Sequence, residues 1–246
     1  MDTLFIADVH LSDERPEKLS LFKTLLRGPA LRARAVYILG DLFENFWLGN
    51  DDRTPPSPEI LTELKAYSDS GKPLFIVRGN RDLMLDSGIE TLTGASLLAD
   101  LSVIDLDGKP VLIAHGDVLC TRDVKYQRFR KFMEHPATRW IFLHLPYSLR
   151  NWLVHLLTPA FKQSASHKRP EIMDVDEGTV IRTMREHGVE ELIHGHTHRP
   201  GMHELTIDNR PARRIVLGDW YDSEMILVCQ GPDRKLISVQ DYLSSS

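Results

Sequence analysis

The chain has 246 residues, of which 42% are apolar and 26% charged, and its formal net charge is −5. These values are typical of globular proteins, and the length allows one large domain or one domain with an insertion. Two cysteines, Cys120 and Cys229, exclude a disulfide framework and a thiolate zinc site, and no uncharged apolar run reaches the roughly 20 residues of a membrane span. Residues 1–10 lack the features of a signal peptide, so we expect a protein of the reducing cytosol.

Predicted strands and helices alternate through the first half of the chain. Apolar runs at residues 3–7, 35–39 and 73–77 predict buried strands, and residues 17–27 and 58–70 have the apolar spacing of helices. Asp107-Gly108 predicts a hairpin between strands at 103–106 and 110–114. Asp174 or Asp176 can cap a helix that ends at His187-Gly188. Further strands are expected at 202–207, 214–217, 225–229 and 236–239.

Basic and apolar residues concentrate in residues 122–170. This block holds ten Lys and Arg against two acids, Asp123 and Glu134, and carries +8, whereas the rest of the chain carries −13. Helices that combine basic residues with apolar ones such as Trp140 and Trp152 are typical of surfaces that meet anionic lipid headgroups. The alternative is a helical insertion whose apolar face packs on the main domain, and the block taken alone favours that alternative.

Almost every predicted strand ends in polar residues that can bind a metal. In α/β sheets such loops converge beyond the carboxyl ends of the strands. We expect these segments to be extended, so that residues two apart, such as Asp8 with His10 or His196 with His198, point the same way. Each cluster alone is weak, but their combination predicts a metal site. The clusters are Asp8-Val9-His10, Gly40-Asp41, Gly79-Asn80-Arg81-Asp82, His115-Gly116-Asp117 and His194-Gly195-His196-Thr197-His198.

These clusters, in this order, resemble the calcineurin-like metallophosphoesterase superfamily over almost the whole chain. The resemblance implies an α/β fold, a four-layer αββα sandwich of two mixed sheets with a helical cap insertion. It also implies two divalent metal ions with Asp41 as the bridging ligand, whereas His194 is not a ligand and is either structural or a partner of the ligands. Asp82 and Asp117 are expected to hold neighbouring groups in place. One ion would take Asp8, His10, Asp41 and His198, and the other Asp41, Asn80, His115 and His196.

Position 81 departs from the superfamily pattern, which has His where this chain has Arg81. Arginine stays charged at working pH and cannot act as a general acid. A phosphate leaving group, with a second pKa near 6, can depart without a proton and needs only a fixed positive charge. Arg81 therefore favours cleavage of a phosphoanhydride. The alternative is that Arg81 merely pairs with Asp82 or Asp86.

Longer strings narrow the resemblance to the UDP-2,3-diacylglucosamine hydrolase family of lipid A biosynthesis. That resemblance implies water attack at the α-phosphorus of UDP-2,3-diacylglucosamine, which gives UMP and 2,3-diacylglucosamine 1-phosphate, with Mn²⁺ as the usual metal. It also implies that the single domain, residues 1–246, carries a lipid-binding helical cap at about 122–170. The strings are LFIADVHL, YILGDLFENFWLGND, GNRD, HGDVLCTRDVKYQRFRKF, IMDVDE, IHGHTHRP and PARRIVLGDWY.

The same resemblance implies which residues meet the substrate. Asn80, Arg81 and His196 would act at the phosphates and be catalytic. The further headgroup contacts would be Asp123, Tyr126 and Lys168. The match weakens between residues 151 and 166, where Ser164 can replace the usual contact after a shift in helix register.

The expected protein is thus a cytosolic pyrophosphohydrolase, peripheral on the cytoplasmic face of the inner membrane. Its expected partners are a UDP-linked diacylated glucosamine lipid and the inner-leaflet surface, and no nucleic acid. Two alternatives remain, a hydrolase of soluble nucleotides or phosphoproteins and a non-catalytic scaffold of the same fold. The intact set of seven ligands argues against the scaffold.

Overall fold

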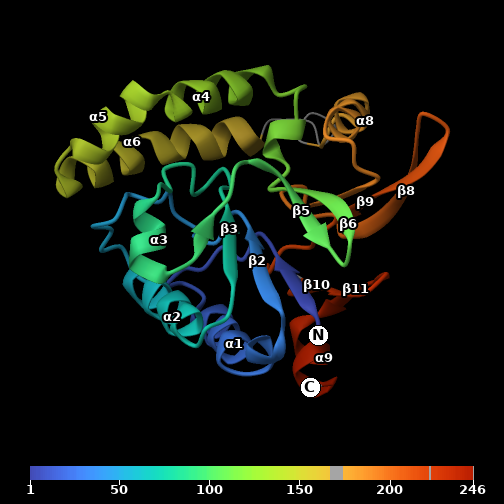
Figure 1. The fold of residues 1–246 in the computed structure, drawn as a ribbon. Coiled ribbons are helices and arrows are strands. Elements are labelled where there is room, and N and C mark those ends of the chain that lie inside the picture. Colours follow the sequence, from blue (N-terminus) through green and yellow to red (C-terminus); the bar gives the residue numbers. More distant parts are fainter. Residues whose placement is uncertain (167–173, 222, 246) are drawn as a thin grey trace.

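The computed structural model describes residues 1–166, 174–221 and 223–245, and within α6 it describes side chains only up to residue 156. Two β-sheets face each other, and helices cover their outer faces (Figure 1). The expected four-layer α/β fold with two mixed sheets is confirmed.

The first sheet has the strand order β11-β10-β1-β2-β3-β4. Its three central strands, β1, β2 and β3, run parallel and are almost fully buried, as their continuous apolar runs predict. The strands are β1 (Thr3–Ile6), β2 (Ala35–Leu39), β3 (Leu74–Val77), β4 (Ser96–Leu97), β10 (Met225–Gln230) and β11 (Asp233–Ser238).

The second sheet has the order β5-β6-β7-β9-β8, in which β6, β7 and β9 run parallel. The predicted hairpin is present, because Asp107 and Gly108 have φ of 58° and 82° and join β5 to β6. The strands are β5 (Leu101–Leu106), β6 (Lys109–Ala114), β7 (Glu191–His194), β8 (Gly201–Ile207) and β9 (Arg210–Val216).

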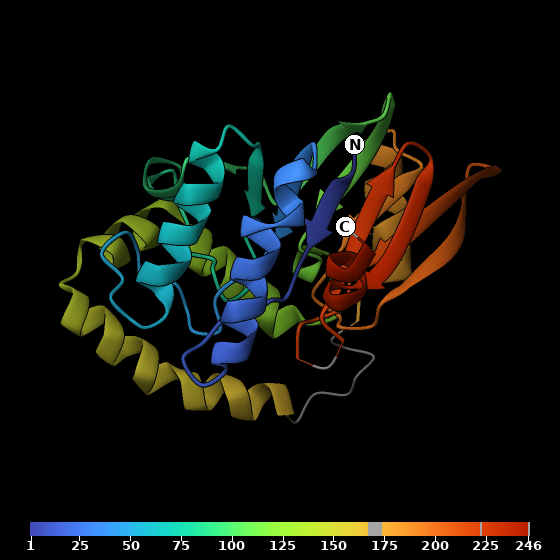
Figure 2. The same ribbon diagram turned by 90° about the horizontal axis from the view of Figure 1, so that it is seen from below.

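Helices cover the outer face of each sheet. Apolar residues of α1 (Pro16–Arg27), α2 (Ser57–Asp69), α3 (Gly88–Thr93) and α9 (Val239–Ser245) pack on the first sheet, and Figure 2 shows α1 and α2 side by side there. Val180 and Met184 of α8 (Glu177–Glu186) pack on the second sheet. Of the two expected caps of α8, Asp176 is the one observed, with Oδ1 accepting a hydrogen bond from Thr179 N at 2.9 Å. Single turns of 3-10 helix are also present at Pro29–Arg32 and Asp117–Leu119.

Three helices, which we call the cap helices, lie along the end of the sheets away from both chain termini (Figure 1). They are α4 (Val124–Glu134), α5 (Pro136–His144) and α6 (Tyr147–Ser166). Within the described residues, no helix is long and apolar enough to span a bilayer. The expected boundaries of the cap, about 122–170, extend into residues that the structure does not describe.

The C-terminal expectation was partly wrong. Residues 236–239 were expected as a strand, but β11 begins at Asp233, and Val239 starts α9 instead. Val239 and Tyr242 are buried against the first sheet. The segment is too short for its sequence pattern to determine its conformation, so packing against the sheet determines that it is helical. The sequence also gave no sign of α3, which has only six residues, or of the two-residue strand β4.

Candidate metal centre

The seven side chains expected to bind metal lie together at one end of both sheets. Each follows a strand that has a parallel neighbour, namely β1, β2, β3, β6 or β7. Parallel strands present their carboxyl ends at the same edge, so distant parts of the sequence meet there. The side chains are Asp8, His10, Asp41, Asn80, His115, His196 and His198.

The backbone of these loops is left-handed, not extended as expected. Asp8, His10, Asp41, His196 and His198 have φ between 51° and 69°. Asp8 N donates to Gly40 O at 3.1 Å, and His10 N donates to Asp41 O at 3.0 Å. The turns therefore keep the backbone hydrogen-bonded to the neighbouring loop while the side chains point inward.

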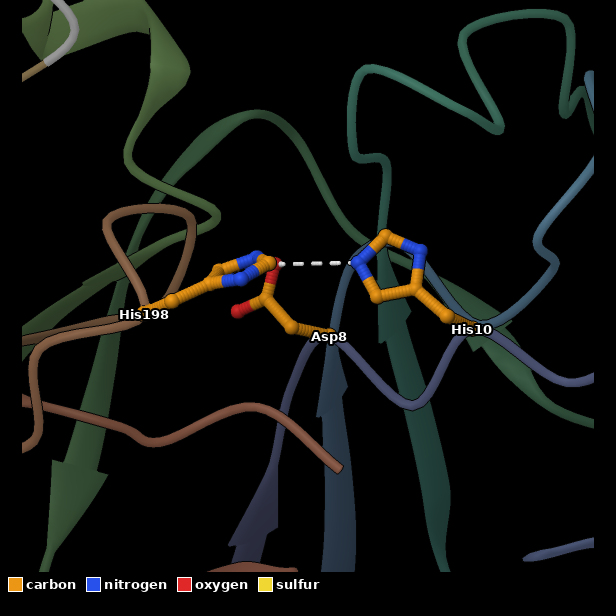
Figure 3. A group of neighbouring side chains, drawn as sticks. All are labelled: Asp8, His10 and His198. Carbon is orange, nitrogen blue, oxygen red and sulfur yellow. Dashed lines mark ion pairs between the residues drawn. The ribbon is translucent and has the colours of Figure 1, made fainter. Parts of the chain in front are cut away.

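Three side chains, those of His10, Asp41 and His198, form a group with the Asp8 carboxylate. Asp8 Oδ1 lies 3.3 Å from His198 Nε2 and 3.9 Å from His10 Nε2. Figure 3 shows these three side chains, from two distant loops, pointing at one another. His10 Nε2 is also 3.8 Å from Asp41 Oδ2. These separations are close to those between ligands that share one ion.

A second group converges on His115. Its Nε2 lies 3.1 Å from Asn80 Oδ1, 3.2 Å from His196 Nδ1 and 3.7 Å from Asp41 Oδ1. Asp41 thus directs Oδ2 toward the first group and Oδ1 toward the second. A carboxylate placed in this way can give one oxygen to each of two ions.

The residues fit a pair of divalent ions. His10 Nε2 and Asp8 Oδ1 are buried, and neither has a hydrogen-bond partner among the described residues. Leaving buried polar atoms unsatisfied is costly, so a ligand at this point would remove the cost. A Cβ at Gly79 would collide with the Asp41 carboxylate, which shows how tightly the loops approach. Mixed carboxylate, amide and imidazole donors favour Mn²⁺, Fe or Zn²⁺ over softer metals.

The electrostatics of the site favour positive charge. Burial, followed by the charge of Asp41, raises the pKa of Asp82 to about 6. Burial acts to lower the pKa of His115, but the charges of Asp41 and Asp8 outweigh it and raise that pKa to about 9. Asp82 also accepts hydrogen bonds from Gly79 N and Leu42 N, so it holds the two loops that carry Asn80 and Asp41.

Two acidic residues that the sequence analysis missed orient the imidazoles. His10 Nδ1 lies 3.2 Å from Glu44 Oε2, and His198 Nδ1 lies 3.2 Å from Asp219 Oδ2. Each contact turns the Nε2 atom of its ring toward the centre. Both acids stand in strings that carried the narrower resemblance, YILGDLFENFWLGND and PARRIVLGDWY, and that was the available signal.

Glu44 is ionised at neutral pH. Burial acts to raise its pKa, but hydrogen bonds from His10 and Tyr221 outweigh burial and lower the pKa to about 2. Tyr221 Oη donates to Glu44 Oε2, and its ring lies 5.0 Å from the His10 ring. A negative charge is therefore held behind His10.

Arg81 lies at the edge of this centre. Its backbone N–H donates to Asp41 Oδ1 at 2.7 Å, and its charge helps to lower the pKa of Glu44. Among the ion pairs of the described residues, none joins Arg81 to Asp82 or Asp86. The Asp82 carboxylate instead accepts from backbone N–H groups.

Two of the remaining expected substrate contacts, Asp123 and Tyr126, lie at the start of α4. Asp123 Oδ1 accepts from Tyr126 N at 3.1 Å and caps α4, and Tyr126 Oη donates to Asp117. Both side chains thus have partners within the protein. The side chain of Ser164 and the whole of Lys168 lie outside the described residues.

An apolar cavity of about 370 Å³ lies beneath the cap helices. Phe46 and Met84 line it from the core side, and residues of all three cap helices line the rest. The interior of the cap is thus suited to hydrocarbon and offers few polar partners. The cap side of the lining comprises Phe129, Phe132, Met133, Ala137, Thr138, Ile141, Phe142, Leu145, Leu153 and Val154.

Comparison with known proteins agrees with this geometry. The family model described as calcineurin-like phosphoesterase matches residues 1–200. The chain is 42% identical to a UDP-2,3-diacylglucosamine hydrolase of Aeromonas hydrophila over 96% of its own length and 98% of that protein. It is 47% identical to the protein of the same name from Pseudomonas entomophila, over 88% of this chain and 90% of that one. A Vibrio vulnificus protein of that name is 44% identical over 92% of this chain and 93% of its own length.

Proposed function

The chain belongs to the calcineurin-like phosphoesterases and, within them, to the UDP-2,3-diacylglucosamine hydrolase family, and from that premise we propose the reaction that it catalyses. It is a metal-dependent hydrolase that cleaves the pyrophosphate bond of UDP-2,3-diacylglucosamine. Water attacks the α-phosphorus, the bond from that phosphorus to the bridging oxygen breaks, and the products are UMP and 2,3-diacylglucosamine 1-phosphate. The observation that carries this function is the convergence of seven donors in a chain that also holds an apolar cavity beneath its cap helices.

The seven donors would hold two divalent ions, for which we propose Mn²⁺. Asp8, His10 and His198 would hold one, Asn80, His115 and His196 would hold the other, and Asp41 would bridge them. When bound, such ions supply positive charge that polarises water and a phosphate oxygen. The hard oxygen and imidazole donors support Mn²⁺. A metal analysis of the purified protein tests this assignment.

Arg81 would stabilise the negative charge that passes to the leaving phosphate. The guanidinium cannot give up its proton, but it can donate two hydrogen bonds to phosphate oxygens. A phosphate with a second pKa near 6 leaves without protonation, so a fixed charge meets the chemical need. Among the described residues no ion pair engages the Arg81 guanidinium, which lies at the edge of the centre next to Asn80, and this supports the role.

The acyl chains would occupy the cavity beneath the cap helices. Full burial contributes about 0.8 kcal/mol per methylene group, so two chains supply much of the binding free energy. Around the headgroup, the proposed contacts are Asn80, Arg81, Asp123, Tyr126, Ser164, Lys168 and His196. For Tyr126, the engaged hydroxyl leaves the ring as the contacting group.

The outer face of the cap supports a peripheral position on the cytoplasmic face of the inner membrane. Trp140 and Trp152 of the cap helices are 62% and 56% exposed, and Phe132, which also lines the cavity, is 62% exposed. Lys125 and Lys131 are also exposed on α4, so the exposed surface of the cap carries both basic and apolar side chains. Tryptophan and lysine together are typical of contact with anionic lipid headgroups, and the partner we propose is the inner leaflet.

The decisive experiment compares UMP release from UDP-2,3-diacylglucosamine with release from UDP-glucosamine, in the presence of Mn²⁺. The acylated substrate should be cleaved much faster, because only it can fill the cavity. Equal rates would refute the lipid assignment and favour a hydrolase of soluble nucleotides. Absence of cleavage of both, with metal bound, would favour the scaffold.

A further inference from the structure

Each of the three cap helices sends one arginine into the core. Arg139 of α5 donates to the carbonyls of Leu83 and Leu85 at 2.5 and 2.7 Å. Arg150 of α6 is buried and donates to Leu48 O and to Asp51. Arg130 of α4 is 3% exposed and donates to Asp117, two residues after His115. Part of the positive charge of the cap therefore faces the core, not solvent or ligand.

Arg130 stands at the centre of a buried polar network. Its Nη1 donates to Asp117 Oδ2, and its Nη2 lies 2.6 Å from Asp100 Oδ2 and 2.8 Å from Glu134 Oε1. Asp100 is also paired with Arg78, at 3.0 Å. One guanidinium thus joins α4 to two separate parts of the core.

The network touches the loop that carries a metal-site residue. Asp117 lies two residues after His115 and is buried. It binds two residues of α4, Tyr126 through Oη and Arg130 through the guanidinium, while Gln127 Nε2 donates to its carbonyl at 2.8 Å. Three side chains from two successive turns of α4 therefore contact the loop that follows β6.

We propose that Arg130 is a positioning residue that fixes α4 on the loop of His115, so that the cap stays closed over the centre during turnover. The inference rests on the proposed function for its substrate. A buried ion pair contributes little net stability, because desolvation offsets the attraction, whereas its geometry is specific. The network is therefore best explained by the need for one fixed distance between cap and metal loop.

A cap that had to open would behave in the opposite way. Weakening the contacts of an opening cap speeds entry and release, whereas weakening those of a fixed cap misplaces the substrate and slows the reaction. The lipid would enter a fixed cap from the side, where Phe132 and Ile141 are both exposed and line the cavity. The direction of the change in turnover thus distinguishes a fixed cap from a cap that opens.

The test compares Arg130→Met and Arg130→Lys with Arg122→Met, an exposed control whose partner is Asp176. For Arg130→Met, we expect kcat/KM on UDP-2,3-diacylglucosamine to fall about tenfold or more, because a displacement near 1 Å has effects of that size. Arg130→Lys should be intermediate. Metal content and the cleavage of bis(p-nitrophenyl) phosphate, which has no acyl chain, should match the wild type.

Unchanged or faster turnover of the lipid in Arg130→Met would overturn the proposal, as would an equal loss on both substrates together with lost metal. If Arg130→Met fails to fold, Arg130→Lys decides by the same criteria. If the wild type releases no UMP, the proposed function fails by itself. Amide hydrogen exchange of the metal-loaded protein then tests the positioning role of Arg130 independently. Exchange in α4 should rise in the Arg130 variants and not in Arg122→Met. Unchanged exchange would refute the positioning role.

Discussion

Glu44→Gln tests whether the contact behind His10 matters for metal binding. Glu44 Oε2 lies 3.2 Å from His10 Nδ1, and Tyr221 Oη donates to the same oxygen. The substitution keeps the shape and an acceptor atom but removes the negative charge. The neutral amide can also rotate and present its NH₂ group to the ring, which would disfavour the tautomer that directs Nε2 to the centre.

The distance between Glu44 Oε2 and His10 Nδ1 sets an upper limit on the free energy lost in Glu44→Gln. Two unit charges 3.2 Å apart interact by about 5 kcal/mol at an effective dielectric constant of 20. An imidazole bound to a metal carries only part of a charge, so the loss should be smaller. Removing such an outer contact typically weakens metal binding 10- to 100-fold, which is about 1.4–2.7 kcal/mol. We expect that loss at the ion that Asp8, His10 and His198 would hold.

Competition between the protein and a chromophoric chelator for Mn²⁺ measures this change. One of two binding events should weaken in Glu44→Gln, and the other should stay as in the wild type. Glu63→Gln is the control, because Glu63 is a buried acid of α2 whose partner is Arg27 of α1 and not a residue of the metal centre. Two unchanged affinities in Glu44→Gln would refute the reasoning, as would equal weakening in Glu63→Gln.

Three further predictions concern the leaving group, the metals and the membrane. Arg81→Ala should lower UMP release about 100- to 1000-fold through lost charge stabilisation and leave metal content unchanged, and metal loss measured together with activity would contradict the role. A chelator should lower the melting temperature measured by calorimetry by about 5–10 °C, since saturating ligand contributes about 2.7 kcal/mol at 100 times Kd. An unchanged melting temperature would show that the folded protein holds no such metals. Replacing both Trp140 and Trp152 by Ser should weaken sedimentation with vesicles of phosphatidylethanolamine and phosphatidylglycerol at least about tenfold, because each buried tryptophan contributes about 1.5–3 kcal/mol. Met202→Ser removes an exposed apolar residue outside the cap and should bind vesicles as the wild type does, and equal binding by all three proteins would contradict the assigned face.

The sequence predicted the central elements of the fold because their patterns are local. The apolar runs of β1, β2 and β3, and the Asp107-Gly108 turn, depend on neighbouring residues alone. Val239 could not be placed in a helix in the same way, because its burial depends on the first sheet. The left-handed loops also escaped prediction, since alternation in sequence does not reveal a positive φ at Asp8 or His10.

At the site, the residue types and their order along the chain were enough to predict that seven donors lie together. Their outer partners required three-dimensional information, because Glu44 meets His10 and Asp219 meets His198 only after both sheets are formed. The sequence analysis predicted the net charge of the cap correctly, but it did not predict which of the charged side chains are buried. Arg130 and Arg150 are counted in the basic block, yet the structure buries both in contacts with the core.

The left-handed backbone of the metal loops bears on how inactive variants should be made. An alanine in this conformation strains the chain by about 1–2 kcal/mol, whereas asparagine and aspartate adopt it readily. Asp8→Ala and Asp41→Ala would therefore remove a ligand and distort a loop together, because both positions have φ near 50°. Asn at either position removes the charge and retains the turn. Substrate-trapping variants for crystallography are accordingly better sought as Asn substitutions than as Ala.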